Sequence, residues 1–377
     1  MLSSKVRKII SILSVILITS VIGTGCSVSN KLKNQTSSDL QKLSISEFEK
    51  DHGSNLDNIS YYKYTGNVTI GFAMDSLKEE RWQKDRDIFL AKAKELNANV
   101  RVTEADGDAS IQISQAEELI SQGVNVLVII PVNGEASSEI VKKAHEAGVK
   151  VLSYDRLIKN SDLDYYISFD NEKVGELQGE ALMKAVPNGN IAYVGGSPTD
   201  NNALLFRKGS MEAISGGLNS NQLHVVMDKY STDWKPDEAY KNVKEMLATN
   251  KDNIKGIICA NDGTASGAIQ ALKEVGLDGK IPVTGQDADL GALQRIAEGK
   301  QLMTVYKPVQ AIAQKAVEMA VNIAENKPVE TGSTVANGSK NVNSLLLKPI
   351  VVTKDNIKDT VVKDGWQTES DIYKNVK

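Results

Sequence analysis

The sequence predicts an α/β fold in which two similar lobes each hold a mostly parallel sheet, and three observations support this prediction. From Val68 onward, short β-branched runs alternate with amphipathic stretches of helical period, which is typical of parallel sheets covered by helices on both faces. The ten strands that precede the C-terminal region are too many for one compact open sheet of this type. The length of 377 residues suits two domains with one core each.

The predicted elements follow this alternation along the chain. The predicted strands are 68–74, 100–104, 126–130, 149–154, 166–169, 190–195, 223–227, 256–260, 281–284 and 303–306, with a further strand at 345–352. The predicted helices between them are 81–96, 111–121, 137–147, 174–185, 237–248, 264–275 and 312–326.

The charge and the cysteine count exclude several functions. The formal net charge is -4, from 44 basic and 48 acidic residues, so we expect no nucleic-acid partner because there is no basic excess to neutralise phosphates. Two cysteines, Cys26 and Cys259, are too few for a disulfide framework or for the thiolate cluster of a structural zinc site. Cys259 lies within a predicted strand, where we expect a buried, inert thiol.

The first 25 residues have the pattern of an export signal. Three basic residues precede an apolar run over 9–22, and small residues then lead to Cys26. Cys26 stands where a bacterial lipoprotein carries its acylated cysteine, so we expect 1–25 to be a signal peptide and Cys26 to be lipidated. The alternative is an uncleaved membrane anchor, because an uncharged run of about 20 residues can span a bilayer. Either alternative places the rest of the chain outside the cytoplasm.

The polar stretch 26–66 is interpreted as a tether between the membrane and the folded part. It is rich in Ser, Asn, Lys and Asp and has no sustained hydrophobic period.

Polar side chains follow the predicted strands, at the edge of a parallel sheet where ligands bind. A single Asp or Asn at such a position is also a common helix N-cap. Together they outline a cleft of fixed donors and acceptors, which suits a neutral polyhydroxylated ligand because each hydroxyl both donates and accepts. These strand ends are Asp75, Asp106, 131–133, Asp155 and Arg156, Asp170 and Asn171, 197–202, 231–234, Asn261 and Asp262, Gln286 and Asp287, and Tyr306 and Lys307.

Two tryptophans lie near this predicted cleft. Trp82 stands at the start of a predicted helix, and Trp234 follows the strand that ends near residue 227. An indole can stack against the C–H face of a sugar ring, although either residue could equally fill the core. Trp366, which is far from any strand end, is assigned to packing.

Catalytic motifs are missing from the sequence. It has no phosphate-binding G-x-x-x-x-G-K-[ST] loop, no H-E-x-x-H, no G-x-S-x-G and no G-x-G-x-x-G after the first strand. The three histidines are scattered, so neither a metal triad nor a nucleophile–base pair is indicated. Asp287 and Asp289 stand two residues apart in a loop that leads into a helix, which gives no particular support to the opposed carboxylates of a glycosidase. We therefore expect no enzymatic activity, no cofactor and no metal.

Several strings resemble the D-xylose-binding proteins of bacterial ABC sugar importers, within the wider family of pentose and hexose periplasmic-binding proteins. The resemblance runs from about Val68 to Trp366. The strings that carry it are ERWQKDRDIF (80–89), VLVIIP (126–131), YDR (154–156), YISFDNEKVGELQ (166–178), GGSPTDNNA (195–203), GAIQAL (267–272), GQDADL (285–290) and MTVYKP (303–308).

The resemblance implies a type I periplasmic-binding fold, with two Rossmann-like lobes joined by a three-segment hinge. The chain would cross between the lobes near Asp170, Val305 and Asn343. The N-terminal lobe would then combine 67–170 with 306–343, and the C-terminal lobe 171–305 with 344–377.

The resemblance also implies a set of sugar-binding residues. The two tryptophans would flank the sugar ring, while carboxylates, amides, arginines and a lysine bond its hydroxyls. The residues of this set are Arg81, Trp82, Asp155, Arg156, Asp200, Asn202, Trp234, Asn261, Asp287 and Lys307.

The function implied is an extracytoplasmic receptor that captures D-xylose or a related monosaccharide. Its membrane partner would be an ABC permease or, alternatively, a sensor kinase that responds to the sugar-closed form. A sugar-responsive repressor shares the two-lobed fold, but it would begin with a basic helix-turn-helix and not with an export signal.

Overall fold

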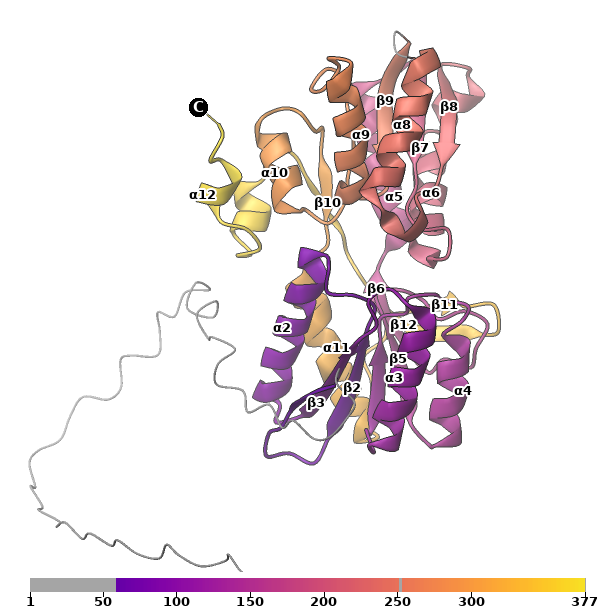
Figure 1. The fold of residues 1–377 in the computed structure, drawn as a ribbon, viewed down its shortest axis with the longest axis vertical. Helices are drawn as coiled ribbons and strands as arrows, with labels where there is room; N and C mark the ends of the chain where they lie inside the picture. The colour runs from indigo at the N-terminus through magenta and orange to yellow at the C-terminus, as the bar shows by residue number, and fades with distance from the viewer. Residues whose placement is uncertain (1–58, 251–252, 377) are drawn as a thin grey trace, which may run out of the picture. The chain divides into compact units, whose positions relative to one another are not determined.

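The computed structural model describes residues 59–250 and 253–376, which form two lobes around separate sheets (Figure 1). The N-lobe sheet has eight strands in the order β1-β3-β2-β4-β5-β6-β12-β11. The central strands are mutually parallel, whereas β1 and β11 pair antiparallel at the two edges. The strands are β1 (Ser60–Tyr62), β2 (Thr69–Met74), β3 (Asn99–Glu104), β4 (Val126–Ile129), β5 (Lys150–Tyr154), β6 (Tyr165–Phe169), β11 (Ser333–Ala336) and β12 (Asn341–Leu347).

Helices cover both faces of the N-lobe sheet, because alternate strand residues point to opposite sides. Even-numbered strand residues such as Phe72 and Val128 pack with α2 (Glu80–Glu95) and α11 (Val309–Ala324). Odd-numbered residues such as Leu127 pack with α3 (Ala109–Ser121) and α4 (Ser138–Glu146). Figure 1 shows these two helix pairs on the two sides of the sheet.

The C-lobe repeats this layered plan. Three parallel strands, β7 (Gly189–Val194), β8 (Leu223–Lys229) and β9 (Ile254–Cys259), lie in the order β8-β7-β9. Helices α8 (Pro236–Asn250) and α9 (Asp262–Glu274) contribute to the core on one face. On the other face, buried residues of α5 (Asn171–Ala185) and α6 (Asn201–Ala213) pack against the sheet. The α/β class with two parallel-sheet lobes is therefore confirmed.

A second, two-stranded sheet completes the C-lobe. Its strands, β10 (Thr304–Tyr306) and β13 (Ile350–Val352), pair antiparallel. Two isolated parallel bridges, Ile257 with Val283 and Gln286 with Val305, connect this pair to β9. The predicted strand 281–284 is therefore a connecting segment with a single bridge, from Val283 to β9, and it forms no strand of its own.

The chain passes between the lobes three times. The first crossing joins β6 to α5 at Asp170, and the second joins β10 to α11 at residues 307 and 308. The third follows β12, which pairs with β6 as far as Leu347 before β13 pairs with β10. The predicted strand 345–352 is thus two strands in different lobes, separated at Lys348 and Pro349. The third crossing lies after Leu347 and not near Asn343.

Some elements of the structure are absent from the sequence prediction. Strand β1 lies inside the stretch interpreted as the tether and pairs with β3. The other additions are α6, β11, α7 (Ser215–Asn219), the 3₁₀ turn η2 (Thr232–Trp234), α10 (Leu290–Ala297), the π-helical turn η3 (Lys358–Val362) and α12 (Glu369–Ile372).

Trp366 packs in the C-lobe core, as predicted. Its side chain lies against Tyr306, and its indole Nε1 donates a hydrogen bond to the Ala288 carbonyl at 2.8 Å.

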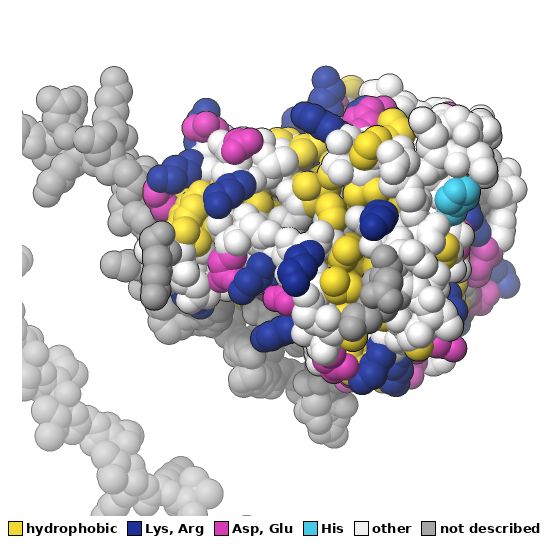
Figure 2. Space-filling model, turned by 90° about the horizontal axis from the view of Figure 1, so that it is seen from above, with side chains coloured by type: hydrophobic (Ala, Val, Ile, Leu, Met, Phe, Trp, Pro, Cys, Tyr) yellow, Lys and Arg dark blue, Asp and Glu magenta, His cyan; other side chains and the backbone are white. Residues whose placement is uncertain are grey.

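The N-terminal predictions, for 1–25 and Cys26, fall outside the residues that the structure describes. Within 59–250 and 253–376, no helix is both long and apolar enough to cross a membrane. Figure 2 shows basic and acidic side chains interspersed over the face seen from above.

Candidate ligand-binding site

The structure brings all ten predicted binding residues to one pocket. Each follows a strand or begins a helix: Arg81 and Trp82 in the first turn of α2, Asp155 and Arg156 after β5, Asp200 and Asn202 at the start of α6, Trp234 in η2, Asn261 before α9, Asp287 after the bridge to β10, and Lys307 after β10. The lining also includes Glu79, Phe206 and Gln286. The side chains fill most of the pocket, which leaves about 20 Å³ of free space.

Arg81 is the central cation of the pocket, and its side chain is almost fully buried. Its guanidinium forms ion pairs with three carboxylates. Nε lies 3.3 Å from Asp85, Nη1 lies 3.5 Å from Asp287, and Nη2 bonds Asp155. Because Asp287 belongs to the C-lobe, Arg81 links the two lobes.

Arg156 makes a second link of the same kind. Its Nη1 lies 2.6 Å from Asp75 in the N-lobe, and its Nε lies 3.0 Å from Asp200 in the C-lobe. Lys307, at the second crossing, lies 3.1 Å from Asp287 and 3.9 Å from Asp155.

Carboxylates outnumber cations in the lining of the pocket. The lining holds four carboxyl side chains, from Glu79, Asp155, Asp200 and Asp287, and three basic ones, from Arg81, Arg156 and Lys307. This balance disfavours an anionic ligand such as a sugar phosphate.

The carboxylates titrate differently because their surroundings differ. Burial opposes ionisation of Asp155, but Arg81 and Lys307 outweigh it and lower the pKa of Asp155 to about 2. Burial raises the pKa of Asp85 to about 6, even though Arg81 and the Tyr154 hydroxyl stabilise its charged form. Burial also raises the pKa of Asp200 above its ordinary value.

Backbone geometry places Asp155 at the pocket. Its φ of 61° is in the left-handed region, where a residue other than glycine needs support from its surroundings. Three side chains donate to its carbonyl oxygen, from Tyr166 at 2.9 Å, Ser168 at 2.6 Å and Asn202 at 3.1 Å. Asn202 comes from the C-lobe, so this contact also joins the lobes.

Asn261 caps a helix and also lines the pocket, so both interpretations of a polar residue at a strand end are correct for this residue. Its side-chain oxygen accepts a 2.8 Å hydrogen bond from the Thr264 backbone and completes a capping box for α9. The cap uses the amide oxygen and not Nδ2, and Asn261 also lines the pocket.

The two tryptophans are held by polar groups as well as by packing. The guanidinium groups of Arg81 and Arg156 lie 4.4 and 5.4 Å from the centre of the Trp82 ring. The Trp234 indole donates to Asp200 at 3.2 Å and meets Phe206 edge-on, with the ring centres 6.2 Å apart.

Comparison with known proteins identifies the family of this chain. The model of the periplasmic binding protein domain matches residues 70–328. The D-xylose-binding periplasmic proteins of Escherichia coli and Haemophilus influenzae are 51% and 49% identical to the chain over 305 and 310 residues. These matches cover 81% and 82% of this chain and 92% and 93% of the two relatives. The chain belongs to the periplasmic binding protein family.

Solved structures support the same assignment to the periplasmic binding protein family. An ABC transporter solute-binding protein from Clostridium phytofermentans, solved with bound β-D-glucose, matches with a TM-score of 0.75 and 28% identity. The match covers 81% of this chain and 99% of that chain. The predicted type I fold is thereby confirmed, and so is a non-enzymatic, extracytoplasmic binding protein.

The binding-protein pocket includes residues outside the predicted set. Phe206 lies one helical turn after Asn202 in α6, so the two share a face, but α6 itself was not predicted. Gln286 was recognised as a polar strand end but was not included among the binding residues. Glu79 precedes α2 and carries no sequence signal that distinguishes it from a surface acid.

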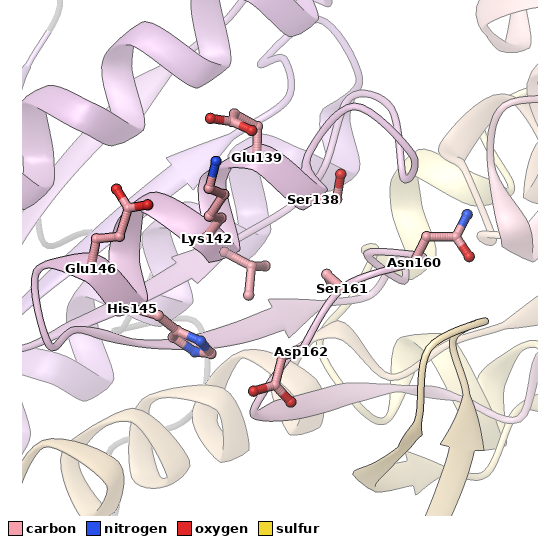
Figure 3. A pocket seen from close by; sticks show the side chains of 9 residues that line it. Ser138, Glu139, Lys142, His145, Glu146, Asn160, Ser161 and Asp162 are labelled. Carbon is pink, nitrogen blue, oxygen red and sulfur yellow. The ribbon is translucent and has the colours of Figure 1, made fainter.

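A larger hollow of about 580 Å³ lies elsewhere on the binding protein, on the surface of the N-lobe. Figure 3 shows it between α4 and the segment 160–162, with Lys142 and Glu146 on one side and Asp162 on the other. Five of its nine lining residues are exposed, and His145 is engaged with Asp164 at 2.8 Å. The buried pocket between the lobes is therefore the better candidate for the ligand.

Proposed function

We propose that this binding protein captures D-xylose between its lobes and delivers it to the permease of an ABC importer. The observation that carries the proposal is that all ten residues implied by the resemblance meet at one pocket, although they come from separate strand ends of both lobes. The two relatives of about 50% identity, whose names state D-xylose binding, support the choice of sugar.

The chemistry of the pocket suits a neutral sugar. Carboxylates accept from hydroxyls, whereas arginine, lysine and asparagine side chains donate to them, so the lining offers both kinds of partner that a hydroxyl needs. Trp82 and Trp234 offer aromatic faces for the ring. The excess of carboxyl over basic side chains in the lining disfavours sugar acids and sugar phosphates.

The sugar would act by stabilising the closed arrangement of the lobes. The ion pairs Arg81–Asp287 and Arg156–Asp200 join the two lobes around the pocket. A ligand that contacts both sets of residues binds the closed form better than the open form and shifts the population toward it. The permease would then recognise the closed surface.

The N-terminal predictions complete this proposal. Lipidation at Cys26 would hold the protein at the outer side of the membrane, with the polar stretch after it as a spacer. An uncleaved anchor within 1–25 would have the same effect, and mass spectrometry of the purified protein would distinguish the two forms by the mass of the acyl chains.

The experiment that tests the ligand is isothermal titration of the exported protein with D-xylose, D-glucose, D-ribose and L-arabinose. We expect saturable binding of D-xylose, with weaker binding of the other three sugars. An absence of heat with all four sugars would refute the sugar assignment while leaving the family assignment intact.

The partner is tested in cells that lack the protein. Delivery to a permease predicts that uptake of labelled xylose is lost and that the wild-type gene restores it, whereas Asp155→Ala does not. Normal uptake together with a lost transcriptional response to xylose would instead identify the sensor-kinase partner.

A further inference from the structure

Gln286 lies on the wall of the pocket with one polar atom unused. The residue is 2% exposed and lines the pocket with its neighbours Asn261 and Asp287. Its side-chain oxygen Oε1 has no hydrogen-bond partner among the residues that the structure describes. A buried amide oxygen without a donor is unfavourable, so such an atom beside a binding pocket indicates a group that the protein itself does not supply.

The orientation of this amide follows from its surroundings. Nε2 donates to the Ala260 carbonyl at 3.4 Å and to the Asp287 carboxylate at 3.2 Å. Both of these partners can only accept, so a flipped amide would place Oε1 against two oxygens. The hydrogen bonds therefore keep Nε2 on the protein side and leave the oxygen free to accept.

The backbone of Gln286 is also fixed. Its carbonyl accepts from the Asp262 amide at 2.9 Å, and the residue forms the parallel bridge to Val305 in β10. Because the backbone and the amide nitrogen are both held, Oε1 has little freedom to find another partner by moving.

We infer that Gln286 Oε1 accepts a hydrogen bond from one hydroxyl of the bound sugar and is a further specificity residue of this site. The inference rests on the proposed function, in which the ligand is a monosaccharide. An acceptor at this position requires a free hydroxyl, so the pocket should discriminate against a sugar that is deoxygenated there.

Gln178 offers a matched control. It is also a buried glutamine, and its Oε1 likewise has no partner within the described residues. Its Nε2 donates to the carbonyls of Cys259, Ala260 and Gly285, so it shares the Ala260 acceptor with Gln286. Unlike Gln286, it does not line the pocket, so Gln178→Met reports what the loss of a buried amide that supports this segment does to binding.

The experiment is a thermodynamic cycle between protein and sugar. Wild type, Gln286→Met and Gln178→Met are titrated with D-xylose and with its 1-, 2-, 3- and 4-deoxy derivatives, the first of which is 1,5-anhydroxylitol. We expect Gln286→Met to weaken binding of D-xylose by about tenfold, in line with the loss of one hydrogen bond to a buried group. For one deoxy sugar, which lacks the partner hydroxyl, the wild type and Gln286→Met should bind equally well.

Several outcomes would overturn the inference. Equal binding of D-xylose by wild type and Gln286→Met would do so, and so would an equal loss across all of the deoxy sugars. Gln286→Leu is measured in parallel, and if neither variant folds, Gln286 is structural and the inference fails. If the wild type binds none of these sugars, the proposed function fails and this inference falls with it, whereas the preceding outcomes affect Gln286 alone.

Discussion

The indole ring of Trp234 lies directly against Gly196, so closely that a β-carbon on Gly196 would come 2.0 Å from Cζ3 of the ring. No side chain other than hydrogen fits there. Trp234 itself has a φ of 58°, which the η2 turn imposes just before α8. The aromatic wall of the C-lobe therefore depends on a glycine that does not face the ligand.

Gly196→Ala should displace Trp234 and weaken sugar binding. The new methyl group and the ring cannot occupy the same space, so the indole must move and lose its contact with Asp200. We expect the dissociation constant to rise by at least about tenfold, which corresponds to about 1.4 kcal/mol. Titration calorimetry measures the affinity, and Trp fluorescence reports the displacement. Gly216→Ala is the matched control because nothing lies within 4 Å of its added carbon, and an affinity loss shared by both variants would contradict the explanation.

Two substitutions of Asn261 should separate its contribution to helix capping from its contribution to sugar binding. Asn261→Ala loses both, so we expect the free energy of unfolding to fall by about 1 kcal/mol and the affinity for xylose to fall as well. Asn261→Asp keeps an oxygen for the Thr264 backbone but replaces the donor Nδ2. It should retain stability in urea unfolding and still lose affinity. Full affinity in Asn261→Asp would remove this residue from the proposed site.

Arg81 should contribute strongly to stability as well as to binding. Arg81→Met leaves the carboxylates of Asp85, Asp155 and Asp287 without their shared cation in a buried place. Removal of one partner of a buried ion pair typically costs about 3–5 kcal/mol. Urea unfolding at neutral pH measures this loss. A variant as stable as wild type would show that the carboxylates become protonated or reach water at little cost.

The titration of Asp85 should appear in the pH dependence of stability. Burial raises the pKa of Asp85 to about 6, above its ordinary value of 3.8, with Arg81, Tyr154 and Asp155 facing it. The folded state therefore holds this proton more tightly than the unfolded state. The stability that the proton contributes is fully present below pH 3.8 and is lost as the pH rises through about 6.

Comparison of Asp85→Asn with wild type tests this titration. From pH 4 to pH 8, Asp85 alone should lower the unfolding free energy of wild type by about 3 kcal/mol, and Asp85→Asn should lack that part of the slope. Asp262, whose pKa burial raises to about 7, would supply a remaining slope in both proteins. Denaturant unfolding at a series of pH values measures both curves, and identical slopes would refute the assignment.

Cys259 should be unreactive in the folded protein. It is fully buried in β9, and burial raises the pKa of its thiol well above the usual value. In a Cys26→Ala variant, which leaves one thiol, we expect a thiol reagent to label Cys259 only after unfolding. Rapid labelling under native conditions would show that β9 opens locally.

The candidate binding residues that the sequence predicted share a simple signal. Asp155 and Asn261 follow the buried strands β5 and β9, and parallel strands bring their carboxyl ends to one edge of each sheet. The order of the strands within each sheet could not be predicted from the sequence, because which strands pair depends on burial across the whole sheet. This is why the segment 281–284 was predicted as a strand although it makes only one isolated bridge to β9.

The elements that were missed have weak local signals. Helix α6 contains two asparagines and a glycine at its ends and interior, and its stability comes from packing against α5. Without this helix, Phe206 had no predicted position. The run 345–352 looks continuous in sequence, but it divides at Lys348 and Pro349 because proline cannot donate in a sheet and each half pairs with a different lobe.

The sequence by itself determined the fold class, the strand ends and the residue types suited to a polyhydroxylated ligand, because these depend on local periodicity and on chemistry. Only the tertiary structure decided which carboxylate each cation pairs with, such as Arg81 with Asp287 and Arg156 with Asp200. It also decided that Gln286 keeps an unused oxygen at the pocket. These features depend on distances between side chains far apart in the chain, which no local pattern encodes.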